Sequence, residues 1–326
     1  MKLLRDISLR PYNTFGIDVK AAQMAVLEPG DDPRCVDALA AGGMMVLGAG
    51  SDVVFTADYG GTVLRLADVA DVAVAAVDTV TAWGGMAMDA LVERTLQQGL
   101  YGLENLSAIP GTVGAAAVQN VGAYGVEAKD RIVSVEVYDL QRHTLVTLTA
   151  AECRFAYRDS LFKQCAGRYL VLRVTFGLSR RFEPVLTYRA LEALPHATAA
   201  EMRNSITEMR WQKLPRPEEH GSAGSFFKNP VVDGDTWRRL RTEYPDMPEA
   251  HATAEGMYKL SAGWLIDRAG WKGRTQGRAG VWPQNALVLY NAGSCTGAEV
   301  LALAGDIQRD IRQKFGIDLV PEAIIV

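Results

Sequence analysis

Cysteine is scarce in this sequence, and no two cysteines have the spacing of a metal site. Cys35, Cys153, Cys165 and Cys295 are scattered over 326 residues without a Cys-x-x-Cys pair. This scatter argues against a zinc-binding motif and against a disulfide scaffold. We therefore expect four reduced cysteines that serve as packing residues, no metal site and a cytoplasmic location.

The sequence also lacks an excess of charge of one sign. Its formal net charge is -4, with 48% hydrophobic and 22% charged residues, which is ordinary for a soluble globular chain. Neither nucleic acid nor a membrane is expected as a partner, and a small molecule is favoured. A charge-free stretch, residues 105–126, contains Pro110, Gln119 and Asn120 and would make a poor lipid-facing helix. Arg5 and Asp6 interrupt the only apolar start, so no targeting segment is expected.

The common nucleotide-binding motifs are incomplete. No G-x-x-x-x-G-K-[ST] motif occurs, and in the turn at residues 46–54 Val53 stands where the dinucleotide fingerprint needs its third glycine. A Rossmann site and a P-loop are therefore excluded. The turn still offers successive backbone N–H groups and the Ser51 hydroxyl, which can hold phosphate oxygens. The alternative is an ordinary tight turn.

The segment Gly102–Gly125 has an unusual composition. It contains five glycines, and three consecutive alanines, Ala115, Ala116 and Ala117, give it short side chains. Glu104 is its only charged residue. Such a backbone can lie flat against something large, and a planar cofactor with polar edges fits that description. The alternative is a tightly packed interior turn.

The hydrophobic pattern predicts a mixed α+β fold without internal repeats. Thr296 and Glu299 form a capping-box pair that starts a helix running to about Phe315, with Gly316 as its stop. The polar, proline-stiffened stretch Lys213–His220 is a candidate domain boundary. The expected strands are Met44–Leu47, Val63–Leu66, Val80–Trp83, Ile132–Leu140, Thr144–Leu148 and Tyr169–Leu178, and two further expected helices are Ala87–Gln98 and Ala199–Lys213.

Three residues stand out as candidates for chemistry. Arg158 can clamp a carboxylate with two hydrogen bonds, although a lone arginine is more often a surface ion pair. Ser225 lies between Gly224 and two aromatic residues, where it is either a general acid or a turn cap. Glu322 lies in an apolar run, where a carboxylate is either used chemically or faces water at an edge.

Short motifs that occur in a fixed order give the sequence a family resemblance. Each is weak alone, but the ordered set is specific and covers essentially the whole chain. The motifs are Asn13–Gly16, Gly48–Ser51, Gly102–Asn105, Ile109–Gly111, Gln119–Gly125, Tyr157–Ser160, Gly224–Pro230, Ala262–Asp267 and Pro321–Glu322. With these motifs the sequence resembles the UDP-N-acetylenolpyruvoylglucosamine reductases of peptidoglycan synthesis, known as MurB.

The resemblance implies an FAD-binding fold of the vanillyl-alcohol-oxidase type, in two subdomains, followed by an α+β substrate-binding domain. The expected boundaries are 1–65 and 66–212 for the subdomains, 213–318 for the substrate domain and 319–326 for a C-terminal segment that carries Glu322. Val185–Tyr188 resembles the tyrosine-bearing loop of the type I subclass, which closes over the nucleotide sugar. We therefore expect a type I member that works as a monomer.

The resemblance also implies the reaction. NADPH would give hydride to a non-covalently bound FAD, which would pass it to C3 of UDP-N-acetylglucosamine enolpyruvate, and both ligands would use one pocket in turn. By motif match, Arg158 and Glu322 would polarise and orient the substrate carboxylate, and Ser225 would protonate C2 to give UDP-N-acetylmuramate. The matching substrate-binding positions are Tyr157, Tyr188, Lys213, Asn229 and Gln284.

The implied FAD-binding positions fall in the glycine-rich segments. They are Gly48, Ala49, Gly50, Ser51, Asp52, Ile109, Pro110, Gly111, Gly114, Gly122, Ala123 and Tyr124. The sequence departs from the family pattern at Asp52, where asparagine is usual, at Ala117, where proline or a similar residue is usual, and at Trp282, often histidine. Asp52 either repels the FAD diphosphate or caps its own turn.

Two other functions remain as alternatives. One is a different flavin oxidoreductase on the same fold, in which Ser225 and Glu322 would have no role. The other is a non-catalytic nucleotide-sugar binder, which Asp52 makes conceivable.

Overall fold

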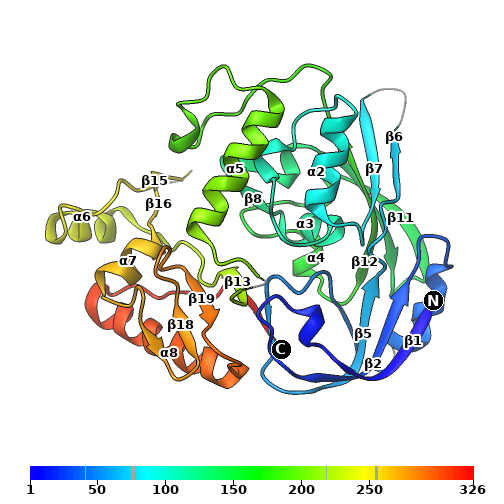
Figure 1. Cartoon of the computed structure of the whole chain (residues 1–326), viewed down its shortest axis with the longest axis horizontal. Helices are drawn as coiled ribbons and strands as arrows, with labels where there is room; N and C mark the ends of the chain where they lie inside the picture. Colours follow the sequence, from blue (N-terminus) through cyan, green and yellow to red (C-terminus); the bar gives the residue numbers. More distant parts are fainter. Residues whose placement is uncertain (41, 75–77, 218, 254–255) are drawn as a thin grey trace. The chain divides into compact units, whose positions relative to one another are not determined.

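The chain divides into two compact units that interleave along the sequence. The computed structural model describes residues 1–40, 42–74, 78–217, 219–253 and 256–326 (Figure 1). The first unit comprises residues 1–7, 21–49 and 59–210, and the second comprises residues 8–20, 50–58 and 211–326. Two short N-terminal segments therefore fold with the C-terminal third of the chain.

The first unit contains two main sheets that share a core. In one sheet β5 pairs in parallel with both β2 and β3, and in the other each neighbouring pair is antiparallel. Leu27 and Leu64 from the first sheet and Tyr138 and Leu172 from the second belong to one buried cluster. The strand orders are β1 (Lys2–Ser8), β2 (Lys20–Leu27), β5 (Tyr59–Leu66), β3 (Met44–Val46), and β11 (Thr144–Thr149), β10 (Ile132–Asp139), β12 (Tyr169–Gly177), β7 (Thr79–Trp83), β6 (Val72–Val74).

Small residues let one helix of this unit pack closely on a sheet. Helix α3 (Val113–Gln119) lies against β12 and β7 (Figure 1). A Cβ at Gly114 would lie 3.1 Å from the Gly84 carbonyl oxygen, so only glycine fits there without a shift. The remaining elements of the unit are α1 (Asp37–Ala40), α2 (Met88–Gln97), α4 (Leu161–Gln164), the first part of α5 (Ala199–Lys213), the hairpin β8 (Gly122–Ala123) and β9 (Val126–Glu127), and the 3-10 turns Pro33–Val36, Glu104–Leu106, Ala128–Asp130 and Arg189–Leu191.

The second unit contains a four-stranded sheet, a three-stranded sheet and a two-stranded parallel pair. Helix α8 (Gly297–Phe315) packs on β18 and α7, and its first residue approaches the segment 50–58 so closely that a Cβ at Gly297 would lie 2.0 Å from the Phe55 carbonyl oxygen. Helix α6 is held by Trp237, whose ring stacks on Tyr258 at 4.3 Å. The remaining elements are β13 (Ser222–Ser225), β19 (Val288–Asn291), β18 (Ala279–Val281), β17 (Thr275–Gln276), β14 (Val231–Val232), β16 (Tyr258–Lys259), β15 (His251–Ala252), β20 (Ile324–Ile325), β4 (Val53–Val54), α6 (Gly234–Glu243), α7 (Ala262–Arg268) and the 3-10 turn Arg10–Tyr12.

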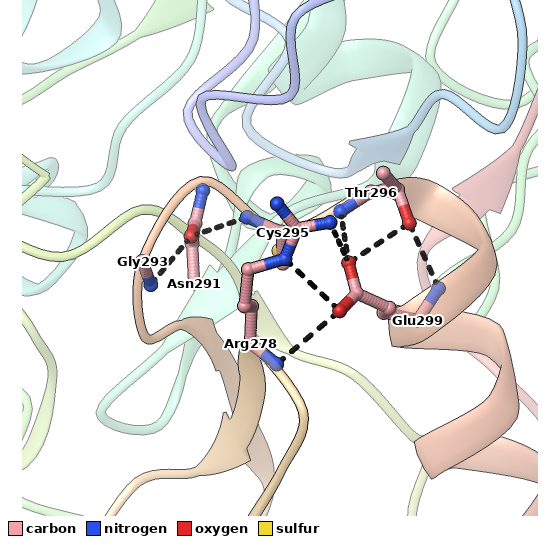
Figure 2. Close-up of polar contacts among 6 residues, drawn as sticks. All are labelled: Arg278, Asn291, Gly293, Cys295, Thr296 and Glu299. Atoms are coloured by element: carbon pink, nitrogen blue, oxygen red, sulfur yellow. Dashed lines mark hydrogen bonds and ion pairs between the residues drawn. The ribbon is translucent and has the colours of Figure 1, made fainter.

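One carboxylate fixes the start of α8 to the neighbouring sheet (Figure 2). Glu299 accepts hydrogen bonds from the Thr296 backbone N–H and hydroxyl at 2.9 and 3.0 Å, which completes the capping box. It also accepts from Nε and Nη2 of Arg278 at 3.1 and 3.0 Å. The Arg278 guanidinium and the Thr296 N–H together lower the pKa of Glu299 from 4.5 to about 2.

This pKa shift predicts an acid-sensitive contribution to stability. The folded-state pKa is below the unfolded value, so the carboxylate stabilises the fold fully above about pH 4.5, and the contribution is lost as the pH falls towards 2. We expect Glu299→Gln to lower the melting temperature at neutral pH, with a difference from the unmodified protein that shrinks through that window. Thermal unfolding at a series of pH values measures it. A difference that does not change with pH would assign Glu299 a role independent of its charge.

The structure confirms the elements expected from the sequence and adds one correction. The expected strands are present as β3, β5, β7, β10, β11 and β12, and the expected helices as α2, α5 and α8. The alanine cluster is not a flat backbone, however, because residues 113–119 form α3, where Ala116 and Ala117 are buried. The large surface that these short side chains meet includes the protein's own sheet.

The structure also describes the cysteines and the groups that could bind a metal. All four cysteines are free, and Cys153 and Cys295 are buried. No cluster of potential metal ligands occurs in the part of the chain that the structure describes. Of the helices in those same segments, none has the length and apolar character to span a membrane.

Candidate active site

The turn at residues 46–54 connects β3 to β4, and the division between the two units falls within it, between Ala49 and Gly50. Gly50 has a φ of +64°, and a Cβ there would lie 2.2 Å from the Tyr12 carbonyl oxygen. Glycine is therefore required by both backbone conformation and space. On the first-unit side, a Cβ at Gly48 would lie 3.0 Å from Oγ1 of Thr112, so this end of the turn packs against the start of α3.

Several backbone N–H groups of these segments are available to a ligand. Ala49, Gly111 and Thr112 in the first unit, and Gly50 in the second, donate to no protein acceptor among the residues that the structure describes. Buried backbone donors normally have a partner, and Gly50 and Thr112 are both buried. The proximity of Gly48 to Thr112 places the Ala49 and Thr112 donors in one region. An anionic group such as a diphosphate has the acceptors that these donors lack.

The loop from Ile109 to Gly114 leads into α3. The Gly111 carbonyl accepts from the Met88 N–H at 3.0 Å, and its φ of +136° lies in the range that favours glycine. Thr112 then caps the helix by accepting from the Ala115 N–H at 3.3 Å. Ile109 is buried and Pro110 is exposed. The N–H groups of Val113 and Gly114 donate to the Met86 and Gly84 carbonyls, whereas those of Gly111 and Thr112 have no protein acceptor within the described segments and are left available.

Arg158 is oriented by the hairpin that carries Gly122, Ala123 and Tyr124. Its Nη2 donates to the Gly122 carbonyl at 3.0 Å. A Cβ at Gly122 would lie 3.3 Å from Nη1 of the same guanidinium. The expected carboxylate-binding arginine and the expected flavin loop are therefore in contact. Next to Gly122 and Ala123, Tyr124 contacts the ring of Tyr188 edge to face at a centroid distance of 5.0 Å, and burial raises the pKa of the Tyr124 hydroxyl.

A lysine that the sequence analysis did not identify also holds Arg158. The Arg158 backbone has a φ of +53°, which is unusual for a residue with a side chain. Nζ of Lys163 donates to the Arg158 carbonyl at 3.1 Å and to Oε1 of Gln119 at 2.7 Å. A short bridge between Ala156 and Asp159 closes the same turn. These contacts impose a strained backbone at a candidate catalytic residue, as is common at functional sites.

Ser225 and Glu322 belong to the second unit, where their backbones are neighbours. Ser225 ends β13 and follows Gly224, whose φ is +66°. The Glu322 N–H donates to the carbonyl of the next residue, Phe226, at 2.8 Å, and Phe227 forms a bridge with Pro321. The C-terminal segment is thereby fixed beside the strand end that carries Ser225.

The other expected substrate positions differ in their surroundings. Oδ1 of Asn229 accepts from the Ala262 N–H at 3.0 Å, at the start of α7. Gln284 and Lys213 are exposed, and Lys213 is the last residue of α5. Tyr157 and Tyr188 of the first unit are each 38% exposed, so both rings can be reached by a ligand.

Of the three positions that depart from the family pattern, Ala117 is buried in α3, and Trp282 and Asp52 have contacts of their own. Trp282 forms a ring cluster with His220 and Tyr290, at centroid distances of 5.4 and 5.2 Å. Its indole Nε1 is buried without a partner among the described residues. The Asp52 carbonyl accepts from the Ile324 N–H at 2.8 Å, which ties the turn to β20.

Comparisons with known proteins show which protein families and which individual proteins this chain is similar to. Residues 34–149 match the model of an FAD binding domain, and residues 216–326 match the model of the UDP-N-acetylenolpyruvoylglucosamine reductase C-terminal domain. A reductase of that name from Pseudomonas aeruginosa is 46% identical over 99% of this chain and 98% of its own length. Another reductase of that name, from Azoarcus, is 42% identical over 100% of this chain and 98% of its own length.

A solved structure supports the fold. The crystal structure of a UDP-N-acetylenolpyruvylglucosamine reductase from Thermus caldophilus matches with a TM-score of 0.69 at 24% identity, and the match covers 100% of this chain and 99% of that one. The expected fold class, an FAD-binding fold with a C-terminal α+β domain, is confirmed.

Proposed function

The chain belongs to the UDP-N-acetylenolpyruvoylglucosamine reductase family, and from that premise we propose how its own residues serve the reaction. The protein is a flavin-dependent oxidoreductase that reduces UDP-N-acetylglucosamine enolpyruvate to UDP-N-acetylmuramate in peptidoglycan precursor synthesis. FAD is its cofactor and NADPH its co-substrate. The observation that carries this conclusion is the identity of 42–46% to reductases of that name over almost the whole chain.

The described residues fit an FAD cofactor, which when bound supplies a two-electron carrier between NADPH and the enolpyruvyl ether. In the first unit, the N–H groups of Ala49, Gly111 and Thr112, which have no protein acceptor among the described residues, suit its diphosphate. Ser51, Asp52, Ile109, Pro110 and Gly114 accompany them in sequence, and Gly122, Ala123 and Tyr124 form the second loop of the proposed FAD site. Asp52 has one structural role in any case, because its carbonyl holds β20.

Arg158 and Glu322 act on the carboxylate of the enolpyruvyl group. Reduction at C3 pushes negative charge through C2 into this carboxylate, so a group that stabilises the charge speeds the step. Arg158 supplies the positive charge, and its contacts with Gly122 and Lys163 fix its direction before substrate arrives. Such preorganisation is the main source of electrostatic catalysis. Glu322 orients the same group from a backbone that is fixed to Phe226.

Ser225 gives the proton that C2 needs after the charge has moved. It ends β13, where it pairs with Val288, and it follows Gly224, which has a positive φ and lies in the register shift between Ser222 and Ser225. A hydroxyl in hydrogen-bonding reach of the reacting carbon can act as a general acid.

Tyr157, Tyr188, Lys213, Asn229 and Gln284 hold the rest of the nucleotide sugar. The exposure of Tyr157, Tyr188, Lys213 and Gln284 supports this assignment. We further propose that NADPH and the substrate use one pocket in turn, and that the protein is a type I, cytoplasmic monomer. The free cysteines are in keeping with a reducing compartment. The boundaries 1–65, 66–212, 213–318 and 319–326 remain our proposal for the domains.

An anaerobic titration tests the proposed function. We expect the purified protein to be yellow, to lose the colour with NADPH and to regain it when the enolpyruvyl sugar nucleotide is added, as followed by flavin absorbance. UDP-N-acetylglucosamine, which lacks the enolpyruvyl group, is the matched control and should not restore the colour. A colourless protein that FAD cannot reconstitute would overturn the assignment. Colour that NADPH removes but the substrate does not restore would favour a different flavin oxidoreductase, and no response to NADPH would favour a non-catalytic binder.

A further inference from the structure

A single buried amide in the first unit joins two loops that the proposed function assigns to different ligands. Asn105, in the 3-10 turn Glu104–Leu106, is only 3% exposed. Its Nδ2 donates to the Tyr124 carbonyl at 2.8 Å and to the Val185 carbonyl at 3.0 Å. Both acceptors are carbonyl oxygens, so the NH2 group must face them and the side chain cannot be flipped. Asn105 thus uses both of its donors to hold together the flavin loop (residues 122–124, the Tyr124 loop) and the tyrosine loop (residues 185–188, the Tyr188 loop).

The tyrosine loop has few other attachments. For residues 184–187, the bond from Asn105 to Val185 is the only hydrogen bond within the described segments. A segment with so few hydrogen bonds has low local stability, which makes each anchor important. The loop also lies close against Gly125, where a Cβ would approach Oγ1 of Thr187 to 2.0 Å. Leu186 packs beside the small core of Leu191, Met202 and Ile206.

The 3-10 turn Glu104–Leu106, which carries Asn105, is itself held by several hydrogen bonds. Both carboxylate oxygens of Glu104 accept from the Gly102 N–H, at 3.0 and 2.9 Å. The Gly102 carbonyl accepts from Nε of Arg131 at 3.2 Å, and the Ser107 hydroxyl donates to the Glu104 carbonyl at 2.5 Å. Asn105 therefore projects from a fixed turn, and the two loops take their positions from it.

We propose that Asn105 is a positioning residue that sets the affinity for the sugar nucleotide by holding the Tyr188 loop against the Tyr124 loop. The inference rests on the proposed function, because it takes Tyr188 as a substrate contact and Tyr124 as a flavin contact. Tyr124 and Tyr188 already meet edge to face, so the latch brings the two contacts to one place. A loop that is ordered beforehand costs less conformational entropy when the ligand binds.

Asn105→Ala tests the latch in the FAD-loaded enzyme. We expect KM for the enolpyruvyl sugar nucleotide to rise about tenfold to hundredfold, the range for two neutral hydrogen bonds, while the rate of colour loss with NADPH changes by less than about twofold. Amide hydrogen exchange at residues 184–188 should become faster. Asn105→Asp has nearly the same shape but turns acceptors toward two carbonyls, so we expect a rise in KM at least as large. A merely packing role would instead leave Asn105→Asp close to the unmodified protein.

Thr95→Ala is the control, because it removes one buried side-chain hydrogen bond, to the Val92 carbonyl within α2, and leaves the Asn105 turn and both loops intact. Leu186→Ala loosens the tyrosine loop from its other side and replaces the Asn105 variants if they do not fold; the same rise in KM is expected. An unchanged KM and unchanged exchange in the folded variants, or an equal rise in Thr95→Ala, would overturn the inference. Failure of the unmodified enzyme to reduce the enolpyruvyl sugar nucleotide would instead overturn the proposed function.

Discussion

Ser225→Ala is expected to slow reduction of the enolpyruvyl sugar nucleotide by about 10²-fold or more, the usual cost of losing a general acid. The colour loss with NADPH should remain nearly unchanged, because that half-reaction needs no proton at C2. Rapid mixing of each half-reaction under anaerobic conditions separates the two rates. The expected asymmetry comes from the proposed place of Ser225, beside the reacting carbon rather than in the FAD-binding turns.

Ser222→Ala is the control for this variant. Ser222 begins the same strand, β13, and its contacts with Thr14 are made by its backbone. Replacing its hydroxyl should therefore leave both half-reactions intact. Equal slowing of both half-reactions in Ser225→Ala would contradict the proton-donor role, because it would indicate damage to the common site.

The fold could be predicted where the signal is local. The helix α8 begins and ends as the capping box at Thr296 and Glu299 and the stop at Gly316 predict, because each of these signals acts within one turn of the chain. Helix α3 was missed, because its glycine and alanine content has no amphipathic period and the reason for its small residues is a sheet strand far away in sequence. The very short strands of the second unit gave no readable alternation.

The interleaving of the two units could not be predicted from composition. The segments 8–20 and 50–58 fold with the C-terminal third through contacts such as Thr14 with Ser222 and Val53 with Ile324. These pairings span more than half of the chain, and no local pattern encodes them. The candidate site shows the same limit. Arg158 was identified as a possible carboxylate clamp from its chemistry and Tyr188 from the family resemblance. The contacts of Lys163 with Arg158 and Gln119, and of Asn105 with Val185 in the Tyr188 loop, became visible only in the structure.

Gly50→Ala is expected either to weaken FAD binding or to lower the stability of the folded protein. Alanine at a φ of +64° costs about 1–2 kcal/mol. The new Cβ would also lie 2.2 Å from the Tyr12 carbonyl oxygen and 2.8 Å from the Asn13 Cα, and overpacking of this kind costs about 1–3 kcal/mol. These are backbone atoms that cannot swing aside, and the Asn13 amide fixes them by donating to the Leu9 and Ile17 carbonyls.

The strain must therefore appear in one of two measurements. If the turn keeps its shape, the melting temperature of the apoprotein falls; if the turn moves, the acceptor-free N–H groups leave their places and the Kd for FAD rises. Combined, the two losses should amount to about 2–5 kcal/mol, where each 1.4 kcal/mol corresponds to about a tenfold change in Kd. Gly60→Ala is the matched control, since Gly60 is exposed and a Cβ there meets nothing within 4 Å. If Gly50→Ala bound FAD and melted as Gly60→Ala does, the turn would be too pliable to serve as the preformed diphosphate site proposed for it.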